Sequence, residues 1–150
     1  MRCSRILAAL LLLTTAVCAK NVDEPLDALK ARAESARPQD QPHLFSTIAR
    51  REVNEADHFY SEGDIPNAKK AVGEVVHYAG WAADAASSSG KHLKETEILL
   101  RQTARRLDDV GKALNFEDRP DVAAAVKQVE EFRQKLLDRM FGGPTREGKR

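Results

Sequence analysis

Cysteine is nearly absent from this chain. Its two cysteines, Cys3 and Cys18, both lie in the first 18 residues, ahead of any segment that could form a domain. The rest of the chain therefore has no disulfide, no thiol nucleophile and no cysteine-based metal site. A disulfide-rich scaffold is excluded, so the fold has to be stable through the packing of its core alone.

Aromatic residues, strand-like patterns and an excess of one charge are also lacking. Aromatic side chains make up 5% of the chain, with a single tryptophan at Trp81. No segment shows the period-two alternation of a half-buried strand. The formal net charge is +1, so no overall attraction to nucleic acid or to an anionic membrane is expected. The sequence predicts an all-α protein with no nucleic acid among its partners.

The one long apolar run, residues 6–19, follows a short basic region at the N-terminus. Its 14 residues are too few to cross a bilayer, for which about 20 are needed. Val17 and Ala19 occupy the −3 and −1 positions of a signal-peptidase site, which predicts cleavage after Ala19. A lipid anchor on Cys18 is the alternative, which the branched Val17 disfavours. We therefore expect a signal peptide at residues 1–19, a periplasmic or extracellular location and no transmembrane segment in the mature chain.

Apolar residues recur at helical spacing along the rest of the chain. A short helix and its linker are expected over residues 20–41, with the helix ending before Pro38. Gly63 is placed to end a helix in the left-handed conformation, and Asp64 and Asp118 to cap the helices that follow them. The four long helices are predicted at residues 42–62, 64–87, 92–116 and 118–141, ahead of a flexible tail at 142–150.

An internal repeat relates the two pairs of long helices. A shift of 54 residues, without a gap, places Asp64 on Asp118, Ala71 on Ala125 and Val75 on Val129. Two long hairpins with short connections favour a bundle. The sequence therefore predicts an antiparallel up-down-up-down four-helix bundle made of two repeated helical hairpins, residues 42–87 and 92–141.

The segment 56–79 resembles one hairpin of the tetratricopeptide repeat. The small and large positions of that pattern are occupied by Ala56, Phe59, Gly63, Ala68 and Val72. The departures are the 54-residue period, against 34 in that family, and the length of the helices. As a whole the chain resembles uncharacterised secreted helical-hairpin proteins, which implies a fold class and no activity.

Charged residues fall within the apolar faces of the long helices. Glu52 lies in the stripe of helix 42–62, Arg106 at the matching repeat position, and Arg133 in the last helix. Because an unpaired buried charge is severely unfavourable, we predict a Glu52–Arg106 ion pair shared with Arg133. We interpret it as a structural layer, with a polar binding site as the alternative.

The repeat also predicts the buried face of helix 92–116, by matching it to the apolar face of helix 42–62. This face comprises Ile98, Leu99, Thr103, Leu107, Val110, Ala113 and Leu114.

Two Glu-x-x-His motifs raise the possibility of a metal site. Glu55 precedes His58, and Glu74 precedes His77, each at i, i+3. Helical bundles that bind two metal ions use this spacing on two helices. A 100° rotation per residue, however, turns His77 away from the apolar stripe of its helix. A metal- or cofactor-binding bundle is therefore the alternative function, and no cofactor is expected.

One aromatic edge lies outside the core stripes, on the second long helix. It comprises His77, Tyr78 and Trp81. Exposed tryptophan and tyrosine often dominate binding, which makes these residues candidate contacts for a partner. Alternatively, the short N-terminal helix covers them with Leu26 and Leu29.

No catalytic motif is present in the sequence. It contains no nucleophile elbow, no glycine-rich phosphate loop and no haem-attachment motif. We therefore expect a non-catalytic binding, scaffold or accessory protein rather than an enzyme. Its partner would be a protein, or a second copy bound through the alanine-rich helix 64–87.

Overall fold

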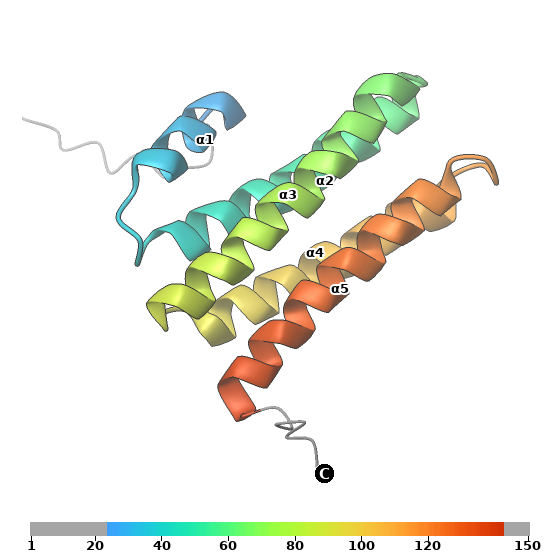
Figure 1. The fold of residues 1–150 in the computed structure, drawn as a ribbon. Helices are drawn as coiled ribbons and strands as arrows, with labels where there is room; N and C mark the ends of the chain where they lie inside the picture. Colours follow the sequence, from blue (N-terminus) through green and yellow to red (C-terminus); the bar gives the residue numbers. More distant parts are fainter. Residues whose placement is uncertain (1–23, 143–150) are drawn as a thin grey trace, which may run out of the picture.

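A computed structural model describes residues 24–142, and within that range all regular structure is helical (Figure 1). The prediction of an all-α protein is confirmed for this part of the chain. The predicted signal peptide and residues 143–150 lie outside the described range. The helices are α1 (Leu26–Ser35), α2 (Gln41–Glu62), α3 (Ile65–Ser89), α4 (Leu93–Ala113) and α5 (Arg119–Phe141).

The connection between α2 and α3 follows its local sequence signals. Gly63 has a φ of 77°, the left-handed conformation that glycine adopts without strain, and it ends α2. The side chain of Asp64 then accepts a hydrogen bond from the backbone N–H of Asn67 at 3.3 Å, which caps α3. Both predictions are confirmed. The short α1 likewise ends before Pro38, as predicted.

The predicted cap of α5 is wrong. Asp118 occupies the N-cap position, but its side chain makes no capping hydrogen bond. Arg119 holds this loop instead: its Nε donates to the carbonyl oxygen of Leu114 at 2.7 Å and its Nη2 to that of Lys112 at 3.3 Å. The guanidinium thus satisfies carbonyl groups that the end of α4 leaves unpaired. As a result, α4 ends at Ala113 rather than at residue 116.

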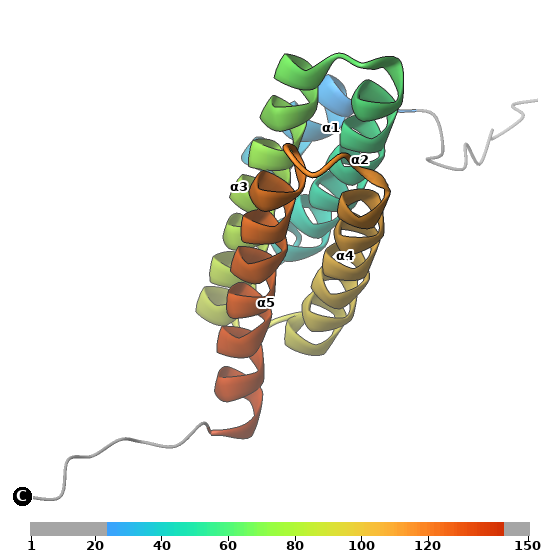
Figure 2. The same cartoon turned by 90° about the vertical axis from the view of Figure 1, so that its right-hand side faces the viewer.

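The helices form three layers: α1, the α2–α3 hairpin and the α4–α5 hairpin (Figures 1 and 2). Within each hairpin the two helices are antiparallel. Between the hairpins, corresponding helices lie side by side and run parallel: α2 lies beside α4, and α3 lies beside α5. His43 and Glu95, near the starts of α2 and α4, are 2.8 Å apart, and Lys69 and Asp121, near the starts of α3 and α5, are 2.9 Å apart.

This packing differs from the arrangement expected from the sequence. The chain direction does alternate along α2–α5, but neighbours across the hairpins are parallel rather than antiparallel. Among the described helices, α2 makes no backbone contact with α5, so these two lie on a diagonal. Helical periodicity could not reveal this difference, because it marks the buried face of a helix without naming the helix that covers it.

Alanine lines the buried face of α3 and lets its neighbours approach closely. At Gly80 of α3, an added Cβ would lie 3.3 Å from the ring of Phe132 on α5. The chain's own helices bury the alanine-rich face of α3 through which self-association was predicted, and self-association itself stays a prediction. The alanines concerned, all at most 4% exposed, are Ala68, Ala71, Ala79, Ala82, Ala83 and Ala86.

The buried face that the repeat predicts for α4, by matching it to α2, is only partly right. Thr103, Leu107 and Val110 are buried as predicted, but Ala113 is exposed, and the fully buried Leu100 was missed. α1 packs against α2, whereas α4 is contacted by α2, α3 and α5 and has no counterpart of α1 among the described helices. The buried face of α4 is therefore narrower and rotated relative to that of α2.

Candidate binding surface around Trp81

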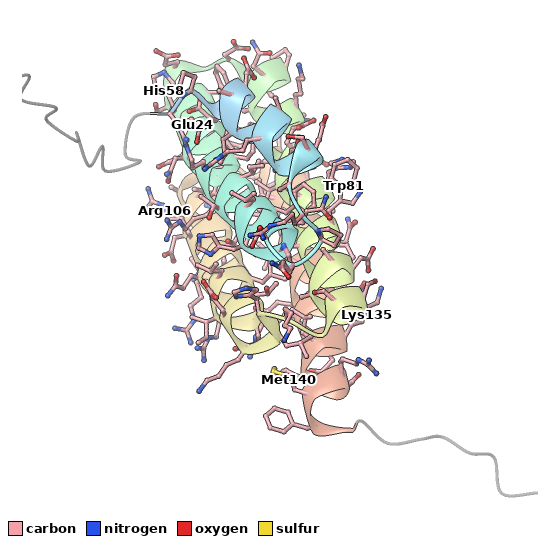
Figure 3. The ribbon with its side chains drawn as sticks, turned by 90° about the vertical axis from the view of Figure 1, so that its left-hand side faces the viewer. Glu24, His58, Trp81, Arg106, Lys135 and Met140 are labelled. Carbon is pink, nitrogen blue, oxygen red and sulfur yellow. The ribbon has the colours of Figure 1, made fainter. Side chains whose placement is uncertain are left out.

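Trp81 is exposed, yet its orientation is fixed by neighbouring rings. On α3, its side chain is 40% exposed and projects from the edge of the molecule (Figure 3). Phe45 of α2 meets its ring at a centroid distance of 5.4 Å and Tyr78 at 5.6 Å, both edge-to-face. The ring of His77 lies 4.0 Å away at 52°. Such geometries are favourable for aromatic pairs and hold the indole in place. The structure thus brings together His77, Tyr78 and Trp81, but Tyr78 is 5% exposed and supports the indole from beneath, so its prediction as a partner contact is wrong.

α1 does not cover Trp81, contrary to the alternative that it would do so through its leucines. Leu29 is buried, but α1 packs its backbone against α2 alone among the described helices. The side chain that reaches the aromatic residues is Lys30, whose Nζ lies 5.3 Å from the centre of the Tyr78 ring. Ten residues long, α1 spans less than half of the α2–α3 layer. Trp81 itself stays 40% exposed, whereas Tyr78, with Lys30 over its ring, is 5% exposed.

Lys30 ties α1 to both helices beneath it. Its Nζ lies 2.6 Å from a carboxylate oxygen of Glu52 on α2 and 3.1 Å from one of Glu74 on α3. Burial raises the pKa of Glu52, and the hydrogen bond from Lys30 lowers it in part. Burial opposes the charge of Lys30, but the two carboxylates prevail and raise the pKa of the ammonium above its ordinary value. Lys30 therefore stays charged and compensates the buried Glu52.

The predicted Glu52–Arg106 ion pair is wrong. Glu52 is 4% exposed and pairs with Lys30, whereas the Arg106 side chain is 53% exposed and pairs with Asp57 at 2.9 Å. Figure 3 shows Arg106 at the opposite edge of the molecule from Trp81. Glu52 is buried because α1 covers its side of α2, and no helix does the same for Arg106.

Arg133 belongs to a separate polar cluster between α4 and α5. Its Nε donates to Glu97 and its Nη1 to Glu130, each at 2.6 Å, and these bonds raise the pKa of the guanidinium. Glu97 is buried, and sequence reasoning missed it. Its one local signal is Arg101, four residues later and 4.0 Å away. Glu52, Arg106 and Arg133 therefore lie in three separate clusters, each of which joins neighbouring helices.

The paired Glu-x-x-His motifs do not assemble into a metal centre. Glu74 pairs with Lys30, His58 lies 3.3 Å from Glu62, and the ring of His77 packs at a tilt against Trp81. Throughout residues 24–142, no group of three or more His, Cys, Asp or Glu side chains is placed to hold a metal ion. The geometry gives no support to the metal-binding alternative.

A carboxylate bridging two histidines was also missed. One carboxylate oxygen of Glu95 lies 2.7 Å from Nδ1 of His92, and the other lies 2.8 Å from Nδ1 of His43. The hydrogen bond with His92, then that with His43, lowers the pKa of Glu95 against the effect of burial. The bridge joins the starts of α2 and α4. Because it spans 52 residues, no local pattern marks it.

The chain matches no protein-family model, no curated protein and no solved structure. None of the helices within residues 24–142 is both long and apolar enough to cross a membrane.

Proposed function

We propose that this chain is an exported, non-catalytic binding protein whose contact surface is centred on Trp81. The observation that carries the proposal is an exposed indole packed against the rings of Phe45, Tyr78 and His77. A tryptophan already held in one orientation loses little conformational entropy on binding. Tryptophan is also among the residues most enriched at the energetic centre of interfaces. Burying an exposed indole in an interface removes a large apolar area from water.

The layered helices would serve as a rigid support for this surface. We propose that α2–α5 act together as one four-helix bundle of two related hairpins. The support for this is that repeat-matched residues are buried in both hairpins: Ala71 with Ala125, and Val75 with Val129. Phe45 and Tyr78, beneath Trp81, come from two different helices of the first hairpin, so the position of the indole depends on that hairpin staying closed.

Export is the second part of the proposal, and the apolar segment 6–19 supports it. Cleavage after Ala19 leaves Lys20 as the new N-terminus, a short distance before α1. Intact-mass analysis of the protein recovered from its own host, with separation of cytoplasmic and exported fractions, checks this. A chain that still carries residues 1–19 in the cytoplasmic fraction would contradict it.

Site-specific photocrosslinking in the native host tests the binding surface. A benzoylphenylalanine at position 81 keeps an aromatic ring there and should give a discrete product of higher mass. The matched control is the same residue at position 116, because Phe116 is an exposed aromatic in the α4–α5 loop, far from Trp81. We expect a product from position 81 and none from position 116. Absence of a product at 81, or equal products at both positions, would refute the proposal.

A further inference from the structure

Two carboxylates flank the aromatic surface. Asp84 follows Trp81 by three residues and so lies on the same side of α3. Glu34, in the last turn of α1, follows by four residues Lys30, whose Nζ lies 5.3 Å from the centre of the Tyr78 ring, and so it lies on the same side of α1. Both side chains are exposed, and within residues 24–142 neither has an ion-pair partner. Their charges are therefore free to act on an incoming group.

The cations of α1 and its linker do not neutralise these carboxylates, because each is already paired. Lys30 is held between two glutamates, Arg32 pairs with a glutamate at 2.8 Å, and Arg37 pairs with an aspartate at 2.8 Å. Lys135 on α5 lies over the ring of Phe132 at 5.4 Å, and that ring packs against Gly80 beside Trp81, so one cation borders this surface on the side of α5. On the side of α1 and α3 the surface is aromatic and carries the carboxylates of Glu34 and Asp84.

An aromatic face beside free carboxylates is complementary to a cationic side chain. A cation is attracted to the face of an indole, and tryptophan is the strongest of the aromatic residues in this respect. Arginine suits the site especially well, because its planar guanidinium can stack on a ring while donating hydrogen bonds to a carboxylate. Phe45 and Tyr78 are nearly fully buried, so Trp81 and His77 present an open platform rather than an enclosed cage.

We propose that the group bound on Trp81 is an arginine or lysine side chain in a basic segment of a partner protein, with Glu34 and Asp84 as its counter-charges. The inference rests on the proposed binding function and specifies the chemistry of the partner. The cation stacks on the indole, and the carboxylates of α1 and α3 select for positive charge from either side.

A peptide titration tests the inference in the whole mature chain. Trp81 is the only tryptophan, so its fluorescence reports on this surface alone. We expect an acetylated tetra-arginine peptide to change the emission saturably, and the neutral tetra-citrulline peptide to leave it unchanged. Raising the salt concentration should weaken the binding. In a Glu34→Gln/Asp84→Asn variant the apparent affinity should fall about fivefold or more, as expected for the loss of two exposed charge contacts.

A matched control separates the flanking carboxylates from general negative charge. The variant Glu117→Gln/Glu131→Gln removes two exposed carboxylates of α5 and the loop before it, and should bind tetra-arginine like the parent. Equal binding of tetra-citrulline, or equal weakening in both variants, would overturn the inference. So would a shift in Trp81 emission caused by deleting residues 143–150 alone, since the chain's own basic tail would then be the occupant. A crosslink at position 81 together with any of these results would leave the binding surface standing and remove only the cationic partner.

Discussion

Removing the charge of Lys30 tests whether α1 supplies the counter-ion for the buried Glu52. In Lys30→Met most of the aliphatic stem is kept, but the ammonium 2.6 Å from Glu52 and 3.1 Å from Glu74 is lost. Breaking a buried ion pair by removing one partner costs about 3–5 kcal/mol. Because the Lys30 side chain is 23% exposed, water replaces part of the interaction. We therefore expect the free energy of unfolding to fall by about 2 kcal/mol.

The pH dependence of this loss has a definite sign. Burial raises the pKa of Glu52 and Lys30 lowers it, so the pKa rises further when Lys30 is replaced. A carboxyl group whose folded-state pKa exceeds its unfolded value binds protons more readily in the folded state. Stability then falls as the pH rises through the window between the two values. The penalty of Lys30→Met should be largest at neutral pH and should shrink towards about pH 4, near the unfolded value.

Urea denaturation followed by circular dichroism at pH 7.5 and pH 4.5 measures this penalty. Lys127→Met on α5 is the control, since Lys127 is exposed and has no ion pair in the described part of the chain. The double variant Lys30→Met/Glu52→Leu should regain most of the stability, because an apolar pair can replace a buried ion pair at little cost. A penalty that is equal at both pH values, or equal to that of Lys127→Met, would refute the reasoning.

Two further predictions concern α4. Leu100→Ala should lower the free energy of unfolding by about 3 kcal/mol, because the side chain is fully buried. Leu99→Ala, at a partly exposed position, should lower it by less than about 1 kcal/mol. Equal losses in urea denaturation would support the buried face predicted from the repeat instead. Glu95→Gln should lower the melting temperature slightly at pH 7, by the equivalent of about 0.5 kcal/mol, since the contacts with His43 and His92 are half-exposed. Because the folded-state pKa of Glu95 is lowered, its contribution exists above the unfolded pKa and is lost as the pH falls through the folded value. The difference between the two melting temperatures should therefore shrink as the pH is lowered below the unfolded value of about 4.3. A difference that persists unchanged at pH 3 would show that the bridge is not electrostatic.

Features of the fold that depend on neighbouring residues could be predicted from the sequence. The turn at Gly63 and Asp64 is an example, because the left-handed glycine and the capping carboxylate act within a few residues of each other. The grouping of His77, Tyr78 and Trp81 was predictable for the same reason, since helical geometry alone places them on one edge of α3.

Features that depend on which helix covers which face were not predictable. Glu52 was recognised as buried, but its partner Lys30 is on α1, and nothing in the periodicity of α2 shows that α1 packs there. The bridge from His43 through Glu95 to His92 likewise requires α2 and α4 to lie in parallel. The repeat gave a wrong prediction for Arg106, which it placed in the core. A sequence repeat preserves the spacing of side chains along a helix, but it does not determine which helices pack around them.

The parallel stacking of the two hairpins brings like ends of helix dipoles together. The positive N-terminal ends of α2 and α4 are neighbours at one end of the molecule, and those of α3 and α5 at the other, so each pair repels. Neither α2 nor α3 carries an acidic residue in its own first turn. The partner helix supplies it: Glu95 of α4 contacts His43 at the start of α2, and Asp121 of α5 contacts Lys69 near the start of α3. The second hairpin thus adds counter-charge at the helix starts of the first, beside the capping carboxylate of Asp64 on α3, which couples the two hairpins electrostatically as well as through their shared core.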